Sequence, residues 1–529
     1  MWTHRYSPRV LERGGRLWTA IAWLGAAALA LALTLPAVWW EPLHPHELAT
    51  LRFARLGPVE ILREIFVDRG GAPLHFLVER LVLVWADGLA GLRVPSLVFF
   101  VLALPAAGLL AARLVDGRAA TLLPLALACA PLAVGLATFG RMYSLLLAAT
   151  LWATVVALWA ARRDSLLGWG LAGGAAGLLA YVHPAAPLYS ALVVLTGLLV
   201  ADVPFRRLLR VAWPAPLALA LVQVPYYAIA LGVLRDRYDV DFGAPRAQAI
   251  SGAGRSVPEQ GLIGLGPGEL AGSFFVLGLA LAGLAWLAWD RPRVAIALAL
   301  WGLVPIAFFT FLPTGTAFFF PRYLLPALPF FLLLAVAGCL GIASFGRVAA
   351  IAGALLFCGL VAWQVADVVR NLDELRDLRL VPLAAKADTP GPELLFGAVG
   401  AGSFGGRPPG LLDEYVVLER PGATRAPEGQ AQALATFAAA DRDPATGVWI
   451  FAGPPATMAS ARARLADVPG ADVVTVSPSV FLVRSAEPLD PRALVELAAA
   501  LREAWLEVEP DDREAERFLR RARYALGAT

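Results

Sequence analysis

The sequence predicts a polytopic α-helical membrane protein that carries a soluble α/β domain at its C-terminus. Hydrophobic residues make up 59% of the 529 residues and charged residues only 16%. Soluble domains typically carry about 25% charged residues. Apolar runs of about 18 residues or more recur as far as residue 370, and each is long enough to cross a bilayer core of about 30 Å. Beyond residue 370, charged residues return, with proline and glycine between short segments.

The apolar runs predict about eleven membrane spans in residues 1–370. The first run, 17–40, is longer than the roughly 7–15 residues of a signal-peptide core, which predicts an uncleaved first span. The predicted spans cover residues 17–40, 93–113, 119–138, 141–161, 165–182, 185–201, 208–233, 269–289, 294–312, 323–343 and 348–369.

One apolar stretch, residues 73–87, is not predicted to cross the membrane. Glu79 and Arg80 stand near its middle, and each charge costs about 2.5–3.5 kcal/mol at the centre of an inserted helix. We expect this stretch to lie along the outer membrane surface, or to dip into the bilayer and return.

The distribution of arginine predicts the orientation in the cell membrane. If 73–87 does not cross, the short basic loops all face the cytoplasm together with the basic N-terminus. Residues 371–529 then lie outside the cell membrane. The net charge of +3 is too small to indicate a nucleic-acid partner. The arginines that set this orientation are Arg113, Arg118, Arg162, Arg163, Arg206, Arg207, Arg210, Arg291, Arg293 and Arg347.

The sequence of residues 371–529 predicts a small α/β domain. The predicted strands are 448–453, 472–476 and 479–485, and the predicted helices are 456–467, 490–505 and 511–526.

Two long segments are predicted on the outer face of the membrane. The first is 41–92. The second, 234–268, is rich in glycine and polar residues, which indicates either a mobile lid or a plain connector.

Ionisable residues gather on the predicted outer face. Arg141 and Arg322 each stand at the outer end of a predicted span. Charges at such depths are costly, so they indicate either a functional site or side chains that extend to the interface. Tyr143 and Tyr323 beside them are interfacial anchors or ligand contacts. The other outer ionisable residues are Glu41, His44, His46, Glu47, Asp68, His75 and His183.

This set of residues suits transfer of a sugar from a polyprenyl-phosphate donor that is held in the membrane. Arg141 and Arg322 would bind the phosphate through bidentate, permanently charged contacts. The acceptor must lose a proton, and the carboxylate of Glu47 or Asp68 would take it. Direct displacement with one base inverts the anomeric centre. The acceptor is a lipid, a glycan or a protein.

The same residues fall in ordered motifs. These are His46-Glu47-Leu48-Ala49-Thr50 with Ala54-Arg55, the segment Asp68 to His75, Arg93-Val94-Pro95-Ser96, Gly140-Arg141-Met142-Tyr143, Tyr181-Val182-His183 and Arg322-Tyr323-Leu324-Leu325-Pro326. In these motifs the chain resembles the polyprenyl-phosphate-sugar-dependent membrane glycosyltransferases of glycosyltransferase family 39. That family has the GT-C fold and includes protein O-mannosyltransferases and lipid A aminoarabinose transferases. The resemblance covers roughly residues 20–345.

The resemblance implies a GT-C-like transmembrane domain over residues 1–370 and a set of substrate-binding residues. The implied substrate-binding residues are Arg55, Arg93, Arg141, Tyr143, His183, Arg322 and Tyr323. One position departs from the family pattern, because His46 replaces the acidic residue that is the family's expected base. Three residues are therefore candidates for the base, namely His46, which titrates near neutral pH, Glu47 and Asp68. The alternative is a non-catalytic relative that binds or translocates lipid-linked sugars.

A divalent metal is a further hypothesis. His44 and His46 are two residues apart, so they face the same side of an extended strand. Glu47 or His183 would complete a set of nitrogen and oxygen ligands suited to zinc. The resemblance points the same way, because aminoarabinose transferases bind a divalent metal near this region.

Overall fold

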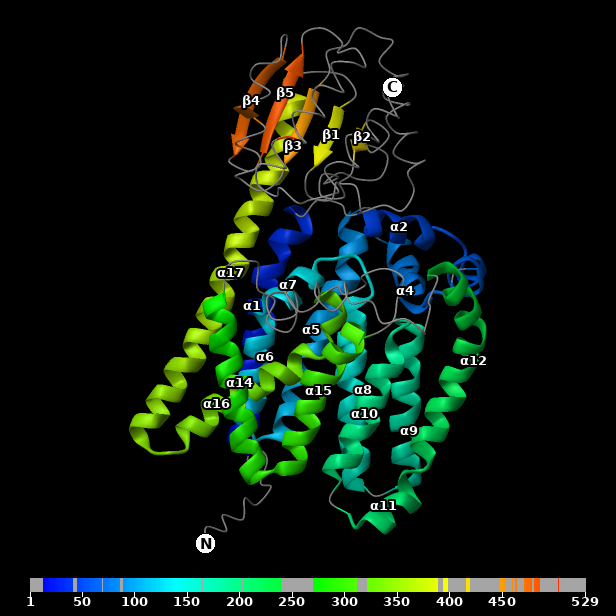
Figure 1. The fold of residues 1–529 in the computed structure, drawn as a ribbon, viewed down its shortest axis with the longest axis vertical. Coiled ribbons are helices and arrows are strands. Elements are labelled where there is room, and N and C mark those ends of the chain that lie inside the picture. The colour runs from blue at the N-terminus through cyan, green and yellow to red at the C-terminus, as the bar shows by residue number, and fades with distance from the viewer. Residues whose placement is uncertain are drawn as a thin grey trace. The chain divides into compact units, whose positions relative to one another are not determined.

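The computed structural model, drawn in Figure 1, divides into two compact units. The helical unit comprises Met1–Leu35, Thr50–Asp87 and Gly91–Val369, and the second unit comprises Pro36–Ala49, Gly88–Ala90 and Arg370–Thr529. The residues that the structure describes are 13–40, 45–68, 70–85, 89–163, 165–201, 203–238, 270–311, 321–388, 393–397, 415–418, 448–452, 471–477 and 480–485, with the single residues Ala459, Arg462, Ala463 and Glu503.

Helices make up the first part of the chain. They are α1 (Arg13–Trp40), α2 (Pro45–Ala54), α3 (Pro58–Ile61), the π-helix η1 (Leu62–Val67), α4 (Leu74–Leu83), α5 (Leu89–Leu114), α6 (Ala119–Ala128), α7 (Pro131–Ala137), α8 (Tyr143–Arg163), α9 (Leu166–Leu178), the 3-10 helix η2 (Leu179–Tyr181), α10 (Ala186–Val200), α11 (Phe205–Ala212), α12 (Pro214–Tyr238), α14 (Leu270–Asp290), α15 (Pro292–Phe311), the 3-10 helix η4 (Pro321–Leu324), α16 (Leu328–Ala343) and α17 (Arg347–Asp388).

Each predicted span coincides with a helix or a pair of helices. Among the described residues, six helices are long and apolar enough to cross a membrane, and the bent pair α6–α7 would make a seventh. Four further apolar helices are shorter, at Leu166–Tyr181, Ala186–Val200, Phe274–Asp290 and Leu328–Ala343. A multi-pass membrane protein follows from these helices, whereas eleven crossings stay a prediction. Within 73–87, the structure has the ten-residue helix α4.

The bend between α6 and α7 has a local cause. The two helices meet at 61°, and α7 begins with Pro131. Ala130 is extended, with φ −65° and ψ 121°, because a residue that precedes proline is disfavoured in the helical region. The chain therefore leaves α6 early, and α7 leads into the irregular segment 138–142 that carries Arg141.

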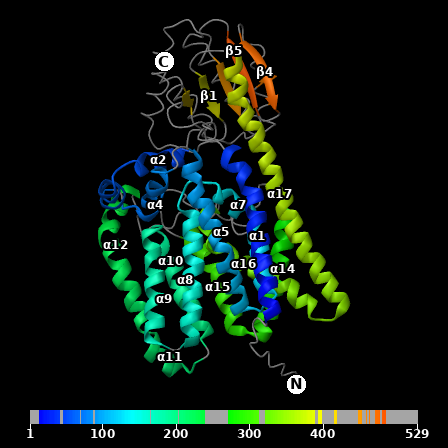
Figure 2. The same ribbon diagram turned by 180° about the vertical axis from the view of Figure 1, so that it is seen from behind.

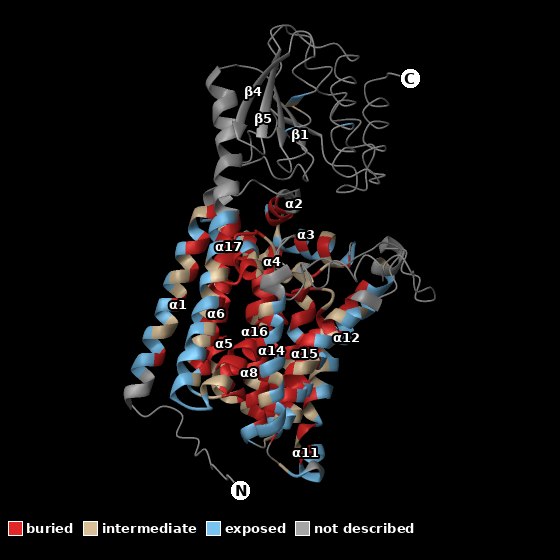
Figure 3. Cartoon of the chain, turned by 60° about the vertical axis from the view of Figure 1, so that its left-hand side comes forward, coloured by how far each residue is buried: buried red, intermediate tan, exposed pale blue. Residues whose placement is uncertain are grey.

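The interior of the helical unit is apolar and closely packed. Trp301 stacks on Phe330 with 3.8 Å between ring centroids, and its Nε1–H donates to Thr196 Oγ1 at 2.8 Å. Large apolar side chains also face outward, and Trp18 on α1 is 72% exposed. Figure 3 shows exposed residues in pale blue along α1 and buried residues in red inside the unit. An apolar surface of this kind suits contact with lipid.

Basic turns gather at one end of the helical unit. Arg291 donates to the carbonyl of Val115 at 2.6 Å, and Arg293 donates to the carbonyl of Ala201 at 3.1 Å. These bonds join the turn after α14 to the ends of α5 and α10. Figures 1 and 2 place these turns near α11, at the opposite end of the unit from α4. The loops predicted to face the cytoplasm therefore lie on one side.

The second unit contains a five-stranded sheet in the order β2-β1-β3-β5-β4. Strand β1 is parallel to β2 and β3, and β5 is antiparallel to β3 and β4. The strands are β1 (Glu393–Gly397), β2 (Tyr415–Leu418), β3 (Val448–Ala452), β4 (Ala471–Ser477) and β5 (Val480–Ser485). The last three coincide with the predicted strands. The predicted helices 456–467, 490–505 and 511–526 and the segment 234–268 lie mostly outside the described residues.

Helices α14 and α16 approach each other at two facing glycines. A Cβ atom on Gly338 would collide with the backbone oxygen of Leu279, and one on Gly283 would collide with the backbone oxygen of Leu334. Close helix packing of this kind is typical of small residues in membrane proteins. Glycine is therefore required at both positions for the helices to approach so closely.

We expect Gly338→Ala to destabilise the helical unit by about 1–3 kcal/mol, because the added methyl group forces the two helices apart. The matched control is Gly278→Ala on α14, where an added Cβ meets nothing within 4 Å. That substitution should leave stability unchanged or raise it by up to about 1 kcal/mol. Thermal unfolding in detergent measures both. Equal melting temperatures for the two variants would contradict the close crossing.

Candidate functional site

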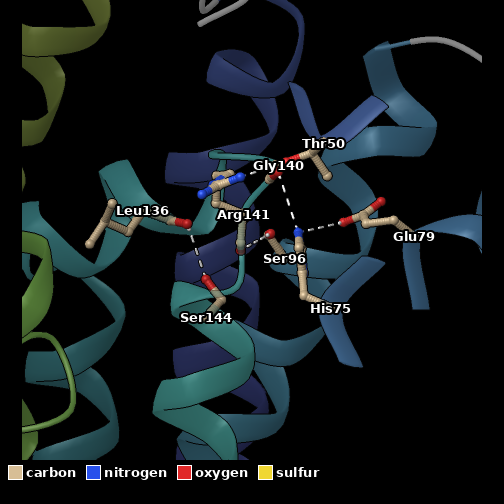
Figure 4. Close-up of polar contacts among 8 residues, drawn as sticks. All are labelled: Thr50, His75, Glu79, Ser96, Leu136, Gly140, Arg141 and Ser144. Atoms are coloured by element: carbon tan, nitrogen blue, oxygen red, sulfur yellow. Dashed lines mark hydrogen bonds and ion pairs between the residues drawn. The ribbon is translucent and has the colours of Figure 1, made fainter. Parts of the chain in front are cut away.

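Arg141 lies in the irregular segment between α7 and α8. Its backbone N–H donates to the carbonyl of Phe139 at 2.6 Å, which makes a tight turn. Its side chain donates from Nη1 to Thr50 Oγ1 at 3.2 Å, as Figure 4 shows. The guanidinium carbon also lies 6.0 Å from the centroid of the Phe76 ring. A hydroxyl and an aromatic ring from two other helices thus hold the charge in place.

Arg322 lies on the 3-10 helix η4, which precedes α16. Its guanidinium carbon is 5.8 Å from the Tyr143 ring centroid and 5.9 Å from that of Tyr323. Both distances fall in the range of a cation–π interaction. The hydroxyl of buried Tyr189 donates to the carbonyl of Tyr323, which fixes η4 against α10. The segment is thereby held with its cation against aromatic rings.

His183 lies beside the same two tyrosines, Tyr143 and Tyr323. Its ring lies 6.0 Å from the Tyr143 ring and 5.5 Å from the Tyr323 ring, centroid to centroid. The pKa of His183 is lowered to about 3, first by burial and then by the charges of Arg141 and Arg322. Its Nδ1 accepts the N–H of Ala185 at 3.1 Å, so the proton of the neutral ring is on Nε2. The positive charges of both guanidinium groups therefore help to keep this one imidazole neutral.

A second buried histidine contacts the backbone next to Arg141. His75 Nε2 is 3.4 Å from the carbonyl oxygen of Gly140 and 3.5 Å from Oε1 of Glu79, as drawn in Figure 4. His75 and Glu79 are both buried, and they stand four residues apart on one face of α4. Burial, and then the charge of Arg141, lower the pKa of His75 to about 3.

Five of these residues form what we call the arginine–aromatic cluster, namely Arg141, Tyr143, His183, Arg322 and Tyr323. They come from α8, η4 and the turns before α8 and α10, which are far apart in the sequence. Two permanent positive charges beside a neutral imidazole favour an anion, and guanidinium groups match a phosphate in geometry. The same charges oppose the binding of a metal cation at His183.

The candidate bases lie in different surroundings. Glu47 is fully buried on α2, three residues before Thr50 on the same helix. Asp68 is exposed at the end of η1, with its carboxylate 3.9 Å from Nε of Arg63. The side chain of His46 lies outside the described part of the chain. Of the two candidate carboxylates, only Glu47 is removed from solvent.

The other predicted binding residues are divided between the surface and the interior. Arg55 is exposed just after α2. Arg93 is fully buried in α5. Three residues further along α5, Ser96 donates from Oγ to the carbonyl of Arg141 at 3.1 Å. The motif Arg93-Val94-Pro95-Ser96 therefore reaches the arginine–aromatic cluster through its serine.

The predicted metal site is only partly described. His44 lies outside the described residues, as does the side chain of His46. Among the described residues, no group of three or more histidine, cysteine, aspartate or glutamate side chains is placed to hold a metal ion. His183, the fourth predicted ligand, lies among aromatic rings and beside two arginine charges.

Several residues that hold the site were not predicted from the sequence as parts of it. Glu79 served there only as a charge that argued against a membrane span, and His75 only as one of the outer histidines. Their spacing of four residues on one helix face was the available signal. Phe76 and Tyr189 carry no such signal, because aromatic residues are common in apolar helices, whereas Thr50 belongs to the first of the ordered motifs.

The fold is similar to that of known structures. The structure is similar to that of ArnT from Cupriavidus metallidurans bound to undecaprenyl phosphate, with a TM-score of 0.52 and 15% identity over 90% of this chain and 98% of that chain. The apo ArnT from the same organism gives a TM-score of 0.50 with 15% identity over 89% of this chain and 98% of that chain. No protein-family model and no curated protein gives a significant match.

The chain therefore has the GT-C fold and resembles the glycosyltransferases that share it. At 15% identity, the similarity establishes the fold, and the chemistry must be argued from the residues of the site.

Stability should depend on pH through the two buried histidines. The pKa of each is about 3 in the folded protein, against an ordinary value of 6.5. Because the folded pKa is lower, protonation favours the unfolded chain. The stabilisation is complete above pH 6.5 and is lost as the pH falls toward 3. The melting temperature in detergent should therefore fall between about pH 7 and pH 4.5.

The double variant His75→Gln, His183→Gln cannot take up these protons, so its melting temperature should change less over the same range. An unchanged pH dependence in the double variant would assign the effect to other groups. The wild-type chain and the double variant are compared in the same buffers and detergent.

Proposed function

We propose that this chain is a membrane glycosyltransferase that moves a sugar from a polyprenyl-phosphate donor to an acceptor outside the cytoplasm. The observation that carries the proposal is that the guanidinium of Arg322 lies over the ring of Tyr143, two residues after Arg141, and that both charges lower the pKa of His183, in a chain with the GT-C fold. The donor phosphate binds to the two guanidinium groups, and its lipid tail stays in the bilayer. Among the similar structures, an ArnT holds undecaprenyl phosphate.

The two arginines also stabilise the leaving group. When the bond from the anomeric carbon to the phosphate oxygen breaks, the phosphate gains negative charge. Preorganised hydrogen-bond donors at that oxygen stabilise the transition state of sugar transfer more than they stabilise the bound polyprenyl-phosphate sugar. The arginines are well suited to this, because their guanidinium groups stay charged in apolar surroundings. The rings of Tyr143 and Tyr323 hold the guanidinium of Arg322 in position before the phosphate binds.

Glu47 is our candidate for the general base, since it is fully buried, whereas the other candidate carboxylate, Asp68, is exposed. It takes the proton from the acceptor, and the acceptor oxygen or nitrogen attacks the anomeric carbon as the phosphate leaves. A single displacement of this kind inverts the anomeric centre. His46 and Asp68 remain the alternative bases.

We propose that the chain crosses the cell membrane eleven times, with its N-terminus in the cytoplasm and residues 371–529 outside as an α/β domain. The basic turns at Arg291 and Arg293 lie together at one end of the helical unit, and their hydrogen bonds to Val115 and Ala201 tie that end together. A common basic side supports this orientation. The arginine–aromatic cluster then faces the outer side.

A second candidate function follows from His46. Because histidine stands where the family carries an acidic residue, the chain would bind or translocate a lipid-linked sugar without transferring it. The arginine–aromatic cluster serves such a role equally well, since binding a phosphate needs no base. Turnover of a labelled donor distinguishes the two functions.

Arg141→Ala and Arg322→Ala should each weaken undecaprenyl phosphate binding by about 10–100-fold, since a hydrogen bond to a charged group contributes about 1.5–3 kcal/mol. The control is Arg63→Ala, which removes a guanidinium from an exposed position that pairs with Asp68. Binding to the purified chain in detergent measures the effect. Normal binding by both cluster variants would show that the phosphate lies elsewhere.

Glu47→Gln should lower the transfer rate about 10²–10⁴-fold, because the amide keeps the shape but cannot take a proton. Undecaprenyl phosphate binding should change little. The assay uses a panel of undecaprenyl-phosphate sugars and follows release of the lipid phosphate. His46→Asp restores the family's acidic pair and should retain activity. Full activity of Glu47→Gln together with loss of activity in His46→Ala would make His46 the base.

A further inference from the structure

Two side chains from different helices hold the backbone carbonyls on either side of the Arg141 Cα. His75 on α4 contacts the carbonyl oxygen of Gly140 at 3.4 Å. Ser96 on α5 donates to the carbonyl of Arg141 at 3.1 Å. Fixing both carbonyls fixes the direction in which the Arg141 side chain leaves the backbone. Figure 4 shows both contacts converging on this turn.

The contacts of His75 determine where its proton lies. Nε2 faces two oxygen atoms, the carbonyl of Gly140 at 3.4 Å and Oε1 of Glu79 at 3.5 Å. A carbonyl oxygen only accepts, so Nε2 must carry the hydrogen and donate it. In the neutral ring Nδ1 then has no hydrogen. The imidazole thus donates to the carbonyl of the turn, and the carboxylate of Glu79 lies beside the same nitrogen at 3.5 Å.

Glu79 lies next to the donating nitrogen of His75. Its side chain is fully buried on the same face of α4 as His75. Burying a carboxylate is costly unless hydrogen bonds compensate for it, and an apolar residue of similar size would fill the space at less cost. A carboxylate that accepts from an imidazole N–H fixes both the tautomer and the orientation of the ring. Such a buried ionisable residue in a membrane protein indicates a functional role.

We propose that Glu79 and His75 are positioning residues for Arg141. Glu79 orients the His75 ring, and the Nε2–H of His75 then holds the carbonyl of Gly140. This contact fixes the turn, and the turn keeps the guanidinium of Arg141 at the place where the donor phosphate binds. The inference rests on the proposed function and deepens it, because it assigns support for the phosphate-binding arginine to α4. Neither residue touches the reacting atoms, so both act through Arg141.

A purely structural pair that ties α4 to the turn is the competing explanation, and a double-mutant cycle separates the two. The measured quantity is the Kd of undecaprenyl phosphate for the full chain purified in detergent. His75→Leu should raise this Kd about tenfold in the wild-type background, the size expected for losing one hydrogen bond at a charged site. In the Arg141→Ala background, the same substitution should have no further effect.

Conservative variants keep the test informative if His75→Leu folds poorly. The amide nitrogen of glutamine occupies the place of Nε2 and that of asparagine the place of Nδ1. His75→Gln should therefore bind as the wild type does, whereas His75→Asn should bind as weakly as His75→Leu. Glu79→Gln keeps an accepting oxygen and should bind more tightly than Glu79→Leu. Glu64→Gln, which removes a carboxylate from η1 in the same outer segment, is the control.

The outcomes distinguish failure of the inference from failure of the proposed function. If Arg141→Ala binds undecaprenyl phosphate normally, the proposed phosphate contact is wrong and the inference falls with it. If Arg141→Ala binds weakly while the leucine variants of His75 and Glu79 bind normally, the inference alone is overturned. It is also overturned if His75→Leu weakens binding equally in both backgrounds, or if His75→Gln binds as weakly as His75→Asn.

Discussion

The helical unit depends on holding two arginine charges in otherwise apolar surroundings. A charge removed from water is costly unless donors, acceptors or aromatic faces compensate for it. Arg141 meets the hydroxyl of Thr50 and the ring of Phe76, and Arg322 lies over the rings of Tyr143 and Tyr323. The neutral state of His183 and His75 follows from the same charges together with burial.

This requirement also accounts for the irregular backbone around the site. Arg141 lies in a turn and Arg322 in a 3-10 helix, and neither is inside a regular membrane span. Breaks in helices within the membrane region are tolerated where protein covers them and satisfies their backbone groups. Here His75 and Ser96 hold carbonyls of the turn, and Tyr189 holds the carbonyl of Tyr323. Three polar side chains of the interior therefore bind backbone carbonyls at the places where regular helix ends.

The fold class and the apolar segments could be predicted from the sequence because each span contains enough apolar residues to be recognised alone. The three strands β3, β4 and β5 were predicted for a similar reason, since each is a short apolar run. The contact of His75 with the turn of Arg141 could not be predicted, because its partner Gly140 lies 65 positions away in the sequence. Arg322 and Tyr143 were predicted as binding residues, but only packing brings the guanidinium over the ring.

The sequence by itself determined that this is a membrane protein. It also determined the apolar helices, the basic turns and the arginines that are candidates for phosphate binding. These are local properties, set by hydropathy over a single segment and by the cost of charge within it. Only the tertiary structure decided that Arg141 and Arg322 act on one imidazole, that Glu47 is buried while Asp68 is exposed, and that α4 supports the turn of Arg141. Those facts depend on which helices pack together, and that packing is set by the shapes of many side chains at once.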